Sequence, residues 1–165
     1  MALNFLDPQY KQTSISRIFG ICDDQNKTPA YIDESDPSTW AAEVVNEDLK
    51  LVSFYPIDYC VDTLREDGKM DNRCDGLLTY EDIFIFVELK DRSKHKWVQE
   101  GLMQLEASIK HFRSAHKELS AQSVIRAQLC NKQRPRAVVS CNVEREKFKE
   151  KVGCIVNVNK RIIIK

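Results

Sequence analysis

One eight-residue stretch constrains the fold more than any other part of the chain: residues 83–90, Ile-Phe-Ile-Phe-Val-Glu-Leu-Lys. Because a strand alternates its side chains, this stretch would place two sets of residues on opposite faces, Phe84, Phe86, Glu88 and Lys90 on one and Ile83, Ile85, Val87 and Leu89 on the other. Both faces are apolar over most of the length, which predicts a central strand covered on two sides. Glu88 and Lys90 would then emerge side by side where the strand leaves the core.

A very short turn at residues 80–82 joins this strand, expected over 82–90, to a second apolar run at 74–80. Such a connection predicts an antiparallel hairpin. Across the hairpin, Asp75 would pair with residues near position 88, and its carboxylate would reach the same corner as Glu88.

The remaining elements alternate, which predicts the α/β class with a central mixed β-sheet flanked by helices. A helix is expected over 38–49, beginning near Pro37, and the apolar spacing from Trp97 to Phe112 predicts another over 95–117. Residues 1–36 are expected to be mixed, with a short helix or strand at 15–21 and a loop over 23–37. The other predicted elements are a strand at 51–57, a helical stretch at 121–130, a buried strand at 136–141, a helix near 144–151 and closing strands at 152–158 and 161–165.

Length and composition limit what this chain can be. At 165 residues it fits one domain, 1–165, large enough to close a hydrophobic core. Its six cysteines lie far apart with no CxxC pair, which favours reduced thiols over disulfides or a zinc site. Neither a secretion signal nor an apolar run of about 20 residues is present, so we expect a cytoplasmic protein with no membrane partner.

The formal charge of zero conceals a division between the two halves of the chain. Residues 1–90 carry a net charge of −10 and residues 91–165 a net charge of +10. An acidic half could gather divalent cations while a basic half faces a polyanion. Alternatively, the two halves simply attract one another within one fold.

The predicted corner carries a specific chemistry. Two neighbouring carboxylates, Asp75 and Glu88, are the oxygen ligands that suit Mg²⁺ or Mn²⁺, ions that complete their shells with water and substrate phosphate. A lysine beside them, Lys90, can hold a water and offset negative charge on a phosphate under attack. These groups indicate a phosphodiester hydrolase.

Asp75-Gly76, followed by Glu88-Leu89-Lys90 closing an apolar strand, resembles the PD-(D/E)XK superfamily of restriction-endonuclease-like nucleases. The predicted order of elements over 38–142 is similar to the αβββαβ core of that superfamily, with 1–36 as an N-terminal extension and 144–165 as a C-terminal helix-strand addition. Gln104 resembles the glutamine of its recombination-exonuclease branch. Two positions depart from the pattern: Cys74 stands where the proline would be, and Ser108 replaces a common aromatic.

The resemblance implies a role for each matching residue. Asp75, Glu88 and the Leu89 carbonyl would bind the Mg²⁺ or Mn²⁺ ion, Lys90 would position the attacking water, and Gln104 would orient the site. Members of the superfamily often add an acid from the first helix; the candidates here are Glu43 and Glu47, with Glu43 preferred.

The expected function is therefore a metal-dependent deoxyribonuclease, with endonuclease and exonuclease action both open. Its DNA contacts are expected at Arg92, Lys94 and Lys96, and a domain this small favours a homodimer. One alternative is a catalytically inactive module of the same fold that binds nucleic acid or a partner protein. Another is an unrelated α/β protein in which Glu88 and Lys90 form only a surface ion pair.

Overall fold

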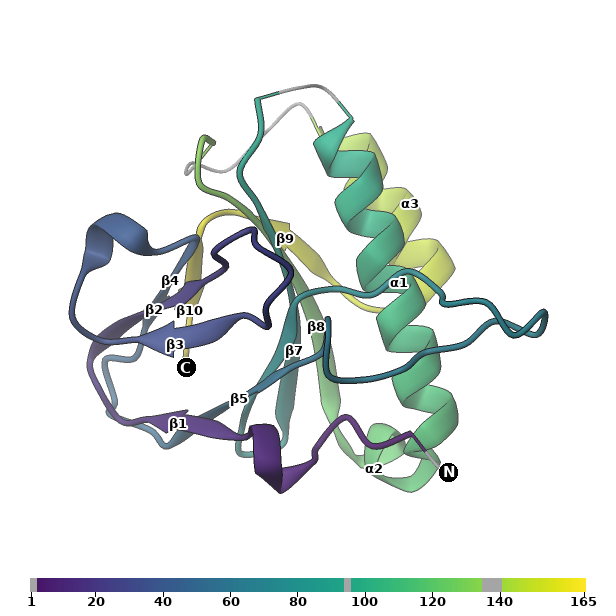
Figure 1. The fold of residues 1–165 in the computed structure, drawn as a ribbon, viewed down its shortest axis with the longest axis horizontal. Coiled ribbons are helices and arrows are strands. Elements are labelled where there is room, and N and C mark those ends of the chain that lie inside the picture. Colours follow the sequence, from purple (N-terminus) through teal and green to yellow (C-terminus); the bar gives the residue numbers. More distant parts are fainter. Residues whose placement is uncertain (1–2, 94–95, 135–140) are drawn as a thin grey trace.

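The computed structural model describes residues 3–93, 96–134 and 141–165. Two β-sheets lie next to each other, and the two longer helices cover the outer face of the larger sheet (Figure 1). The α/β class with a mixed sheet is thus confirmed. The larger sheet, called sheet A, has the strand order β1-β5-β6-β7-β8-β9, and the smaller one, sheet B, has the order β10-β4-β2-β3.

Sheet A is built around the stretch that the sequence singles out. Its strands are β1 (Gln12–Ser14), β5 (Val52–Pro56), β6 (Gly76–Tyr80), β7 (Ile83–Lys90), β8 (Val124–Asn131) and β9 (Val156–Val158). β5, β6 and β7 form an antiparallel meander, and β8 pairs with β7 in parallel. Such a parallel partner requires a crossover, which α1 (Trp97–Ala115) and α2 (Lys117–Gln122) supply.

The predicted alternation of β7 is confirmed. Phe84 and Phe86 belong to the core beneath α1, whereas Ile85 and Val87 belong to the core between the two sheets. Phe112 of α1 packs against Phe86 with ring centroids 5.3 Å apart. A strand with one apolar set on each face can hold two layers together, which explains why β7 is central.

The prediction of a helix over 121–130 is wrong, because most of that segment is strand β8. Ala127 and Leu129 are buried under α1, while Arg126 and Gln128 face the other way. The period is therefore two, and eight register pairs with β7 outweigh the helix propensity of Ala, Gln and Leu.

The helix predicted over 38–49 is also wrong. A short 3-10 turn, η2 (Pro37–Thr39), leads instead into β4 (Ala42–Val45), which pairs antiparallel with β2 (Ile18–Cys22) and parallel with β10 (Arg161–Ile163). Ala42 and Val44 are fully buried while Val45 is only partly so, an alternation that suits a strand. The remaining strand of sheet B, β3 (Tyr31–Asp33), lies in a segment expected to be loop.

The last part of the chain closes both sheets. The helix predicted near 144–151 is present as α3 (Asn142–Val152), and a short 3-10 helix, η1 (Pro8–Tyr10), lies near the other end of the chain. The closing strands are shorter than expected and join different sheets, β9 to sheet A and β10 to sheet B. Residues 136–140 of the strand predicted over 136–141 lie outside the described residues, and Cys141 directly precedes α3.

Five of the six cysteines are buried, all except Cys60, and Cys22, Cys60, Cys74, Cys130 and Cys154 are free thiols. In the described part of the chain no helix is long and apolar enough to cross a membrane.

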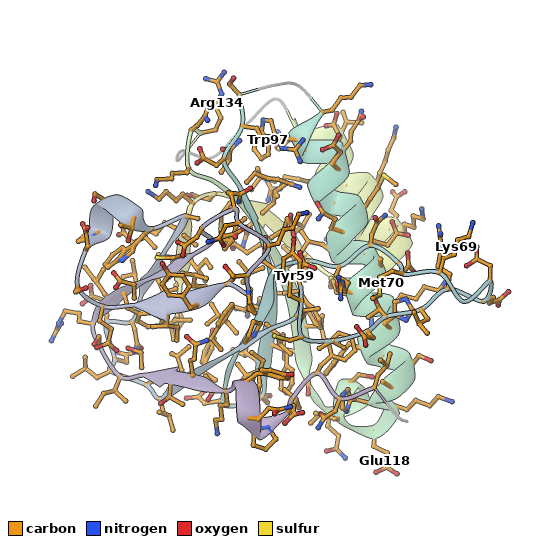
Figure 2. All side chains as sticks on the ribbon, viewed as in Figure 1. Tyr59, Lys69, Met70, Trp97, Glu118 and Arg134 are labelled. Carbon is orange, nitrogen blue, oxygen red and sulfur yellow. The ribbon has the colours of Figure 1, made fainter. Side chains whose placement is uncertain are left out.

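Residues 64–70 form an arm closed by a bridge between Leu64 and Met70, and Figure 2 shows Lys69 and Met70 on this arm, beyond α1.

Candidate active site

The hairpin of β6 and β7 brings Asp75 next to Glu88, as the sequence predicts. Gly76 pairs with Val87, so the residues immediately outside this pair are Asp75 and Glu88. Asp75 Oδ2 accepts a hydrogen bond from the Leu89 backbone N–H at 2.7 Å. The aspartate side chain thus takes the place of a strand partner at the position where β6 has not yet begun.

Lys90 is held between an acid and an amide. Its Nζ lies 3.0 Å from Glu88 Oε1 and donates a hydrogen bond to Gln104 Oε1 at 2.5 Å. Gln104 is in turn oriented by its own amide, because Nε2 donates to the Arg73 carbonyl at 3.2 Å. Helix α1 therefore contributes a residue that fixes Lys90, as the resemblance implies.

The Glu88–Lys90 pair is buried, with exposures of only 2% and 5%, which rules out a surface ion pair. Burial raises the pKa of Glu88 to about 7, an increase that Lys90 partly offsets. Burial, together with the neighbouring Glu88 carboxylate, raises the pKa of Asp75 well above its usual value. Both carboxyls resist ionisation because they are buried. A positive ion bound between them would stabilise their charged forms, so this corner favours a bound cation.

A cavity of about 210 Å³ opens onto this corner. It lies at the end of sheet A where β5 ends and β6 begins, next to the loop that follows β2. The residues that line it include Asp75, Glu88, Leu89, Lys90 and Gln104 from the predicted site, together with Asp23, Lys27, Asp58, Tyr59, Asp91 and Arg92.

Asp23 and Asp58 are acids of this cavity that the sequence reasoning missed. Asp58 comes two residues after β5, at the same end of the sheet as Asp75, because β5 and β6 run antiparallel with Pro56 opposite Gly76. Its carboxylate is paired with Arg73 at 3.0 Å. Asp58 could have been predicted, because it directly follows the strand expected over 51–57. Nothing in the sequence indicates that the loop of Asp23 reaches this corner.

The residues present fit a hard divalent cation in one specific respect. Glu88 Oε2 is buried and has no hydrogen-bond partner among the described residues, although Oε1 of the same carboxylate is occupied by Lys90. In a strand, the N–H and the C=O of one residue point to the same side. Because the Leu89 N–H donates to Asp75, the Leu89 carbonyl points to the Asp75 side as well. No three His, Cys, Asp or Glu side chains within residues 3–93, 96–134 and 141–165 form a complete metal-binding group. A cation here would thus need water or substrate oxygens, as Mg²⁺ commonly does.

The structure corrects the predicted position of the third acid. Neither Glu43 nor Glu47 lines the cavity. Glu43 lies on β4 in sheet B and is paired with Arg161, and Glu47 is paired with Arg17. The prediction placed both on a helix beside the site, but Glu43 is on a strand of the other sheet and Glu47 lies in the turn that follows that strand.

Of the three cations expected to contact DNA, one lines the cavity. Arg92 does so and pairs with Glu100 of α1 at 2.9 Å, with both side chains about half exposed. Lys96 is exposed, directly precedes α1 and is not part of the cavity wall. Lys94 lies outside the described residues.

The two positions that depart from the superfamily pattern contact each other. The Cys74 backbone N–H donates to Ser108 Oγ at 2.8 Å, and both residues are fully buried. A serine on α1 therefore anchors the chain just before Asp75. No family model, no curated protein and no solved structure matches this chain.

Proposed function

We propose that this chain is a Mg²⁺- or Mn²⁺-dependent phosphodiester hydrolase that acts on DNA. The observation that carries the proposal is the buried Glu88 carboxylate, which lies beside Asp75 and Lys90 at an open cavity and leaves Oε2 without a partner among the described residues. An unsatisfied buried carboxylate oxygen is costly, and a protein retains one where a ligand completes it.

Asp75, Glu88 and the Leu89 carbonyl would hold the divalent cation. When bound, this ion would supply the Lewis acid that polarises a phosphate oxygen. The raised pKa values of both carboxyls are consistent with this role, because the positive charge of the ion would remove the reason for their reluctance to ionise.

Lys90 retains one donor for the reaction. An ammonium has three N–H groups, and two of these are directed to Glu88 and Gln104. The third can hold a water molecule or a phosphate oxygen with a fixed direction, since both other bonds anchor the side chain. Gln104 acts as a positioning residue through Lys90.

The surroundings support a substrate that carries phosphates. Lys27 and Arg92 line the cavity next to the carboxylates and would contact phosphates that flank the scissile bond. The elements β5, β6, β7, α1 and β8, with the short α2 between the last two, follow the βββαβ part of the αβββαβ order that the resemblance implies. That resemblance, rather than the cavity itself, is what favours DNA over other phosphodiesters.

The test is cleavage of single-stranded, double-stranded and branched DNA in the presence of Mg²⁺ or Mn²⁺. Lys90→Met keeps the length of the side chain and removes the charge, and it should lower kcat at least about 100-fold. Lys50→Met is a matched control, because Lys50 pairs with Glu81 at the same 3.0 Å but lies outside the cavity; its kcat should equal that of the wild type.

Calorimetry with Mn²⁺ separates this function from a module that binds without cutting. The wild type should release or absorb heat on binding Mn²⁺, and Asp75→Asn should weaken that binding. If no DNA substrate is cut and Mn²⁺ produces neither heat nor a shift in melting temperature, the hydrolase proposal is wrong and the inactive module of the same fold becomes the better explanation.

A further inference from the structure

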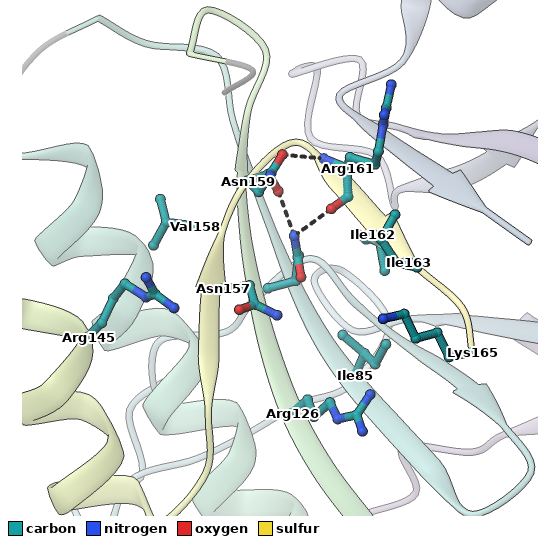
Figure 3. Close-up of a pocket in the computed structure, with 11 residues that line it drawn as sticks. Ile85, Arg126, Arg145, Asn157, Val158, Asn159, Arg161, Ile162, Ile163 and Lys165 are labelled. Atoms are coloured by element: carbon teal, nitrogen blue, oxygen red, sulfur yellow. Dashed lines mark hydrogen bonds between the residues drawn. The ribbon is translucent and has the colours of Figure 1, made fainter. Parts of the chain in front are cut away.

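A second cavity, of about 340 Å³, lies on the other side of sheet A (Figure 3). It opens where β8 and β9, at one edge of sheet A, diverge from β10, at the edge of sheet B. This volume falls within the range of sites that enclose small ligands. It shares no lining residue with the candidate active site.

The strand register explains which side chains reach this cavity. Arg126 of β8 is opposite Ile85 of β7, and Asn157 of β9 is opposite Gln128 of β8, so these four side chains lie on one face of sheet A. Ile85 belongs to the core between the sheets, whereas Glu88 emerges on the face covered by α1. The cavity and the candidate active site therefore lie on opposite faces of the same sheet.

The wall of the cavity is positively charged. Its ionisable lining residues are Arg126, Arg145, Arg161 and Lys165, and no Asp or Glu side chain of the described residues lines it. Two of these cations have other roles: Arg161 is paired with Glu43 at 3.3 Å and points away from the cavity in Figure 3, and Arg145 Nε donates to the Val156 carbonyl at 3.0 Å.

Arg126 and Lys165 have no such role. Neither the Arg126 guanidinium nor the Lys165 ammonium has a hydrogen-bond or ion-pair partner among the residues that the structure describes. Figure 3 shows both charged groups beside Ile85, at the same end of the cavity. Arg126 is only partly exposed, so part of its side chain packs against the cavity wall while no described residue accepts a hydrogen bond from its guanidinium. A guanidinium has five N–H donors in a planar fork that matches the oxygens of a phosphate.

The polar floor of the cavity is rigid. Gln128 is buried and its Nε2 donates to the carbonyls of Asn159 at 2.6 Å and Arg161 at 3.1 Å, bonds that Figure 3 shows as dashed lines. These bonds hold the amide in place and tie β8 to the turn between β9 and β10. The floor beneath a ligand is therefore preformed, and the ordering cost of binding falls on the Arg126 and Lys165 side chains.

We propose that this cavity binds a phosphate group, with Arg126 as the main anchor and Lys165 beside it. The phosphate could belong to a free nucleotide or to the backbone of a nucleic acid, because the same fork recognises both. This site does not depend on the proposed hydrolase activity, since it uses the opposite face of sheet A and different residues.

The experiment uses the full chain in EDTA, so that the candidate active site holds no divalent cation. Isothermal titration with inorganic phosphate and with a nucleoside 5′-monophosphate is the first arm. Fluorescence anisotropy with a labelled 20-nucleotide single strand, over a series of salt concentrations, is the second. Arg126→Gln is compared with Arg65→Gln, which removes the same charge from an exposed arginine outside the cavity. Circular dichroism and thermal melting confirm that each variant is folded.

If the ligand is a free phosphate or nucleotide, the wild type binds the small probes, and Arg126→Gln weakens that binding about 10-fold to 100-fold while Arg65→Gln does not. If it is a nucleic-acid backbone, Arg126→Gln lowers the affinity for the strand and reduces its salt dependence, log K against log[salt], by a slope of about 0.7, again without a matching effect of Arg65→Gln. Arg126→Lys, which keeps the charge but not the fork, should lie between the wild type and Arg126→Gln.

The proposal is overturned if neither probe class binds in an Arg126-dependent way, or if Arg65→Gln has the same effect as Arg126→Gln. Should Arg126→Gln not fold, Arg126→Lys alone decides, and binding equal to that of the wild type for all probes is then the contradicting result. The two proposals can fail separately. Absence of DNA cleavage with intact Arg126-dependent binding would contradict only the hydrolase proposal, and DNA cleavage without Arg126-dependent binding would contradict only the phosphate-site proposal.

Discussion

Replacing Glu88 with glutamine should make the stability of the cation-free protein less sensitive to a rise in pH from about 4.5 to about 7. The pKa of this carboxyl rises from 4.5 in the unfolded chain to about 7 in the folded protein, chiefly because it is buried. Between these two pH values the folded state keeps a proton that the unfolded state has released. The free energy of unfolding therefore falls as the pH rises from about 4.5 to about 7 and does not change further above that range on account of this group.

The size of the effect follows from the two pKa values. A change from 4.5 to about 7 corresponds to about 3 kcal/mol of stability lost across this range. Glutamine has nearly the same shape and can still accept the Lys90 N–H, but it does not ionise. Between pH 4 and pH 8, Glu88→Gln should thus lose about 3 kcal/mol less stability than the wild type.

The assay is urea denaturation at pH 4 and pH 8 in EDTA, followed by circular dichroism. Glu81→Gln is the matched control, because Glu81 is also paired with a lysine but its side chain is 59% exposed. Its pH dependence should equal that of the wild type. Equal pH dependence in Glu88→Gln and the wild type would refute the argument that a buried, partly unsatisfied carboxyl occupies this corner.

Three further changes test the packing. Gly20→Ala should reduce the free energy of unfolding by about 1–3 kcal/mol or slightly more, because the new Cβ would lie 1.9 Å from the ring of the buried Trp40. Thermal or urea denaturation measures this loss, and no change would show that the ring moves freely. Phe112→Ala removes a fully buried ring in contact with Phe5 and should cost about 3–5 kcal/mol, and a loss below about 1 kcal/mol would contradict this core. Burial lowers the pKa of His116, whose Nε2 accepts the Phe5 N–H, so the unfolded chain takes up a proton first as the pH falls below 6.5. His116→Gln should therefore lose less stability than the wild type as the pH falls from 7 to 5, measured by urea denaturation.

The β6–β7 hairpin was predictable because its determinants are local. Two apolar runs joined by a very short turn allow one register, and that register alone brings Asp75 to Glu88. The contact of Lys90 with Gln104 was predictable for a similar reason. The apolar face of α1 determines which residues of the helix reach the end of β7.

Elements whose conformation depends on distant partners were predicted less well. The segment containing β4 has apolar spacing that fits a helix, yet its strand form is stabilised by β2 and β10, which come from opposite ends of the sequence. The same error misplaced the third acid. Asp23 could not be found at all, because only the packing of sheet B against sheet A brings its loop to the cavity.

The sequence alone determines that a carboxylate pair and a lysine emerge together at the end of a central strand, because alternation and hairpin register are properties of neighbouring residues. It also contains the division of charge between the halves of the chain. Only the tertiary structure decides where those charges gather. The cavity at Glu88 takes most of its acids from the first half, and all four cations of the second cavity come from the second half, with Arg126 on the opposite face of sheet A. Long-range strand pairing separates the two sites, and no local pattern encodes that pairing.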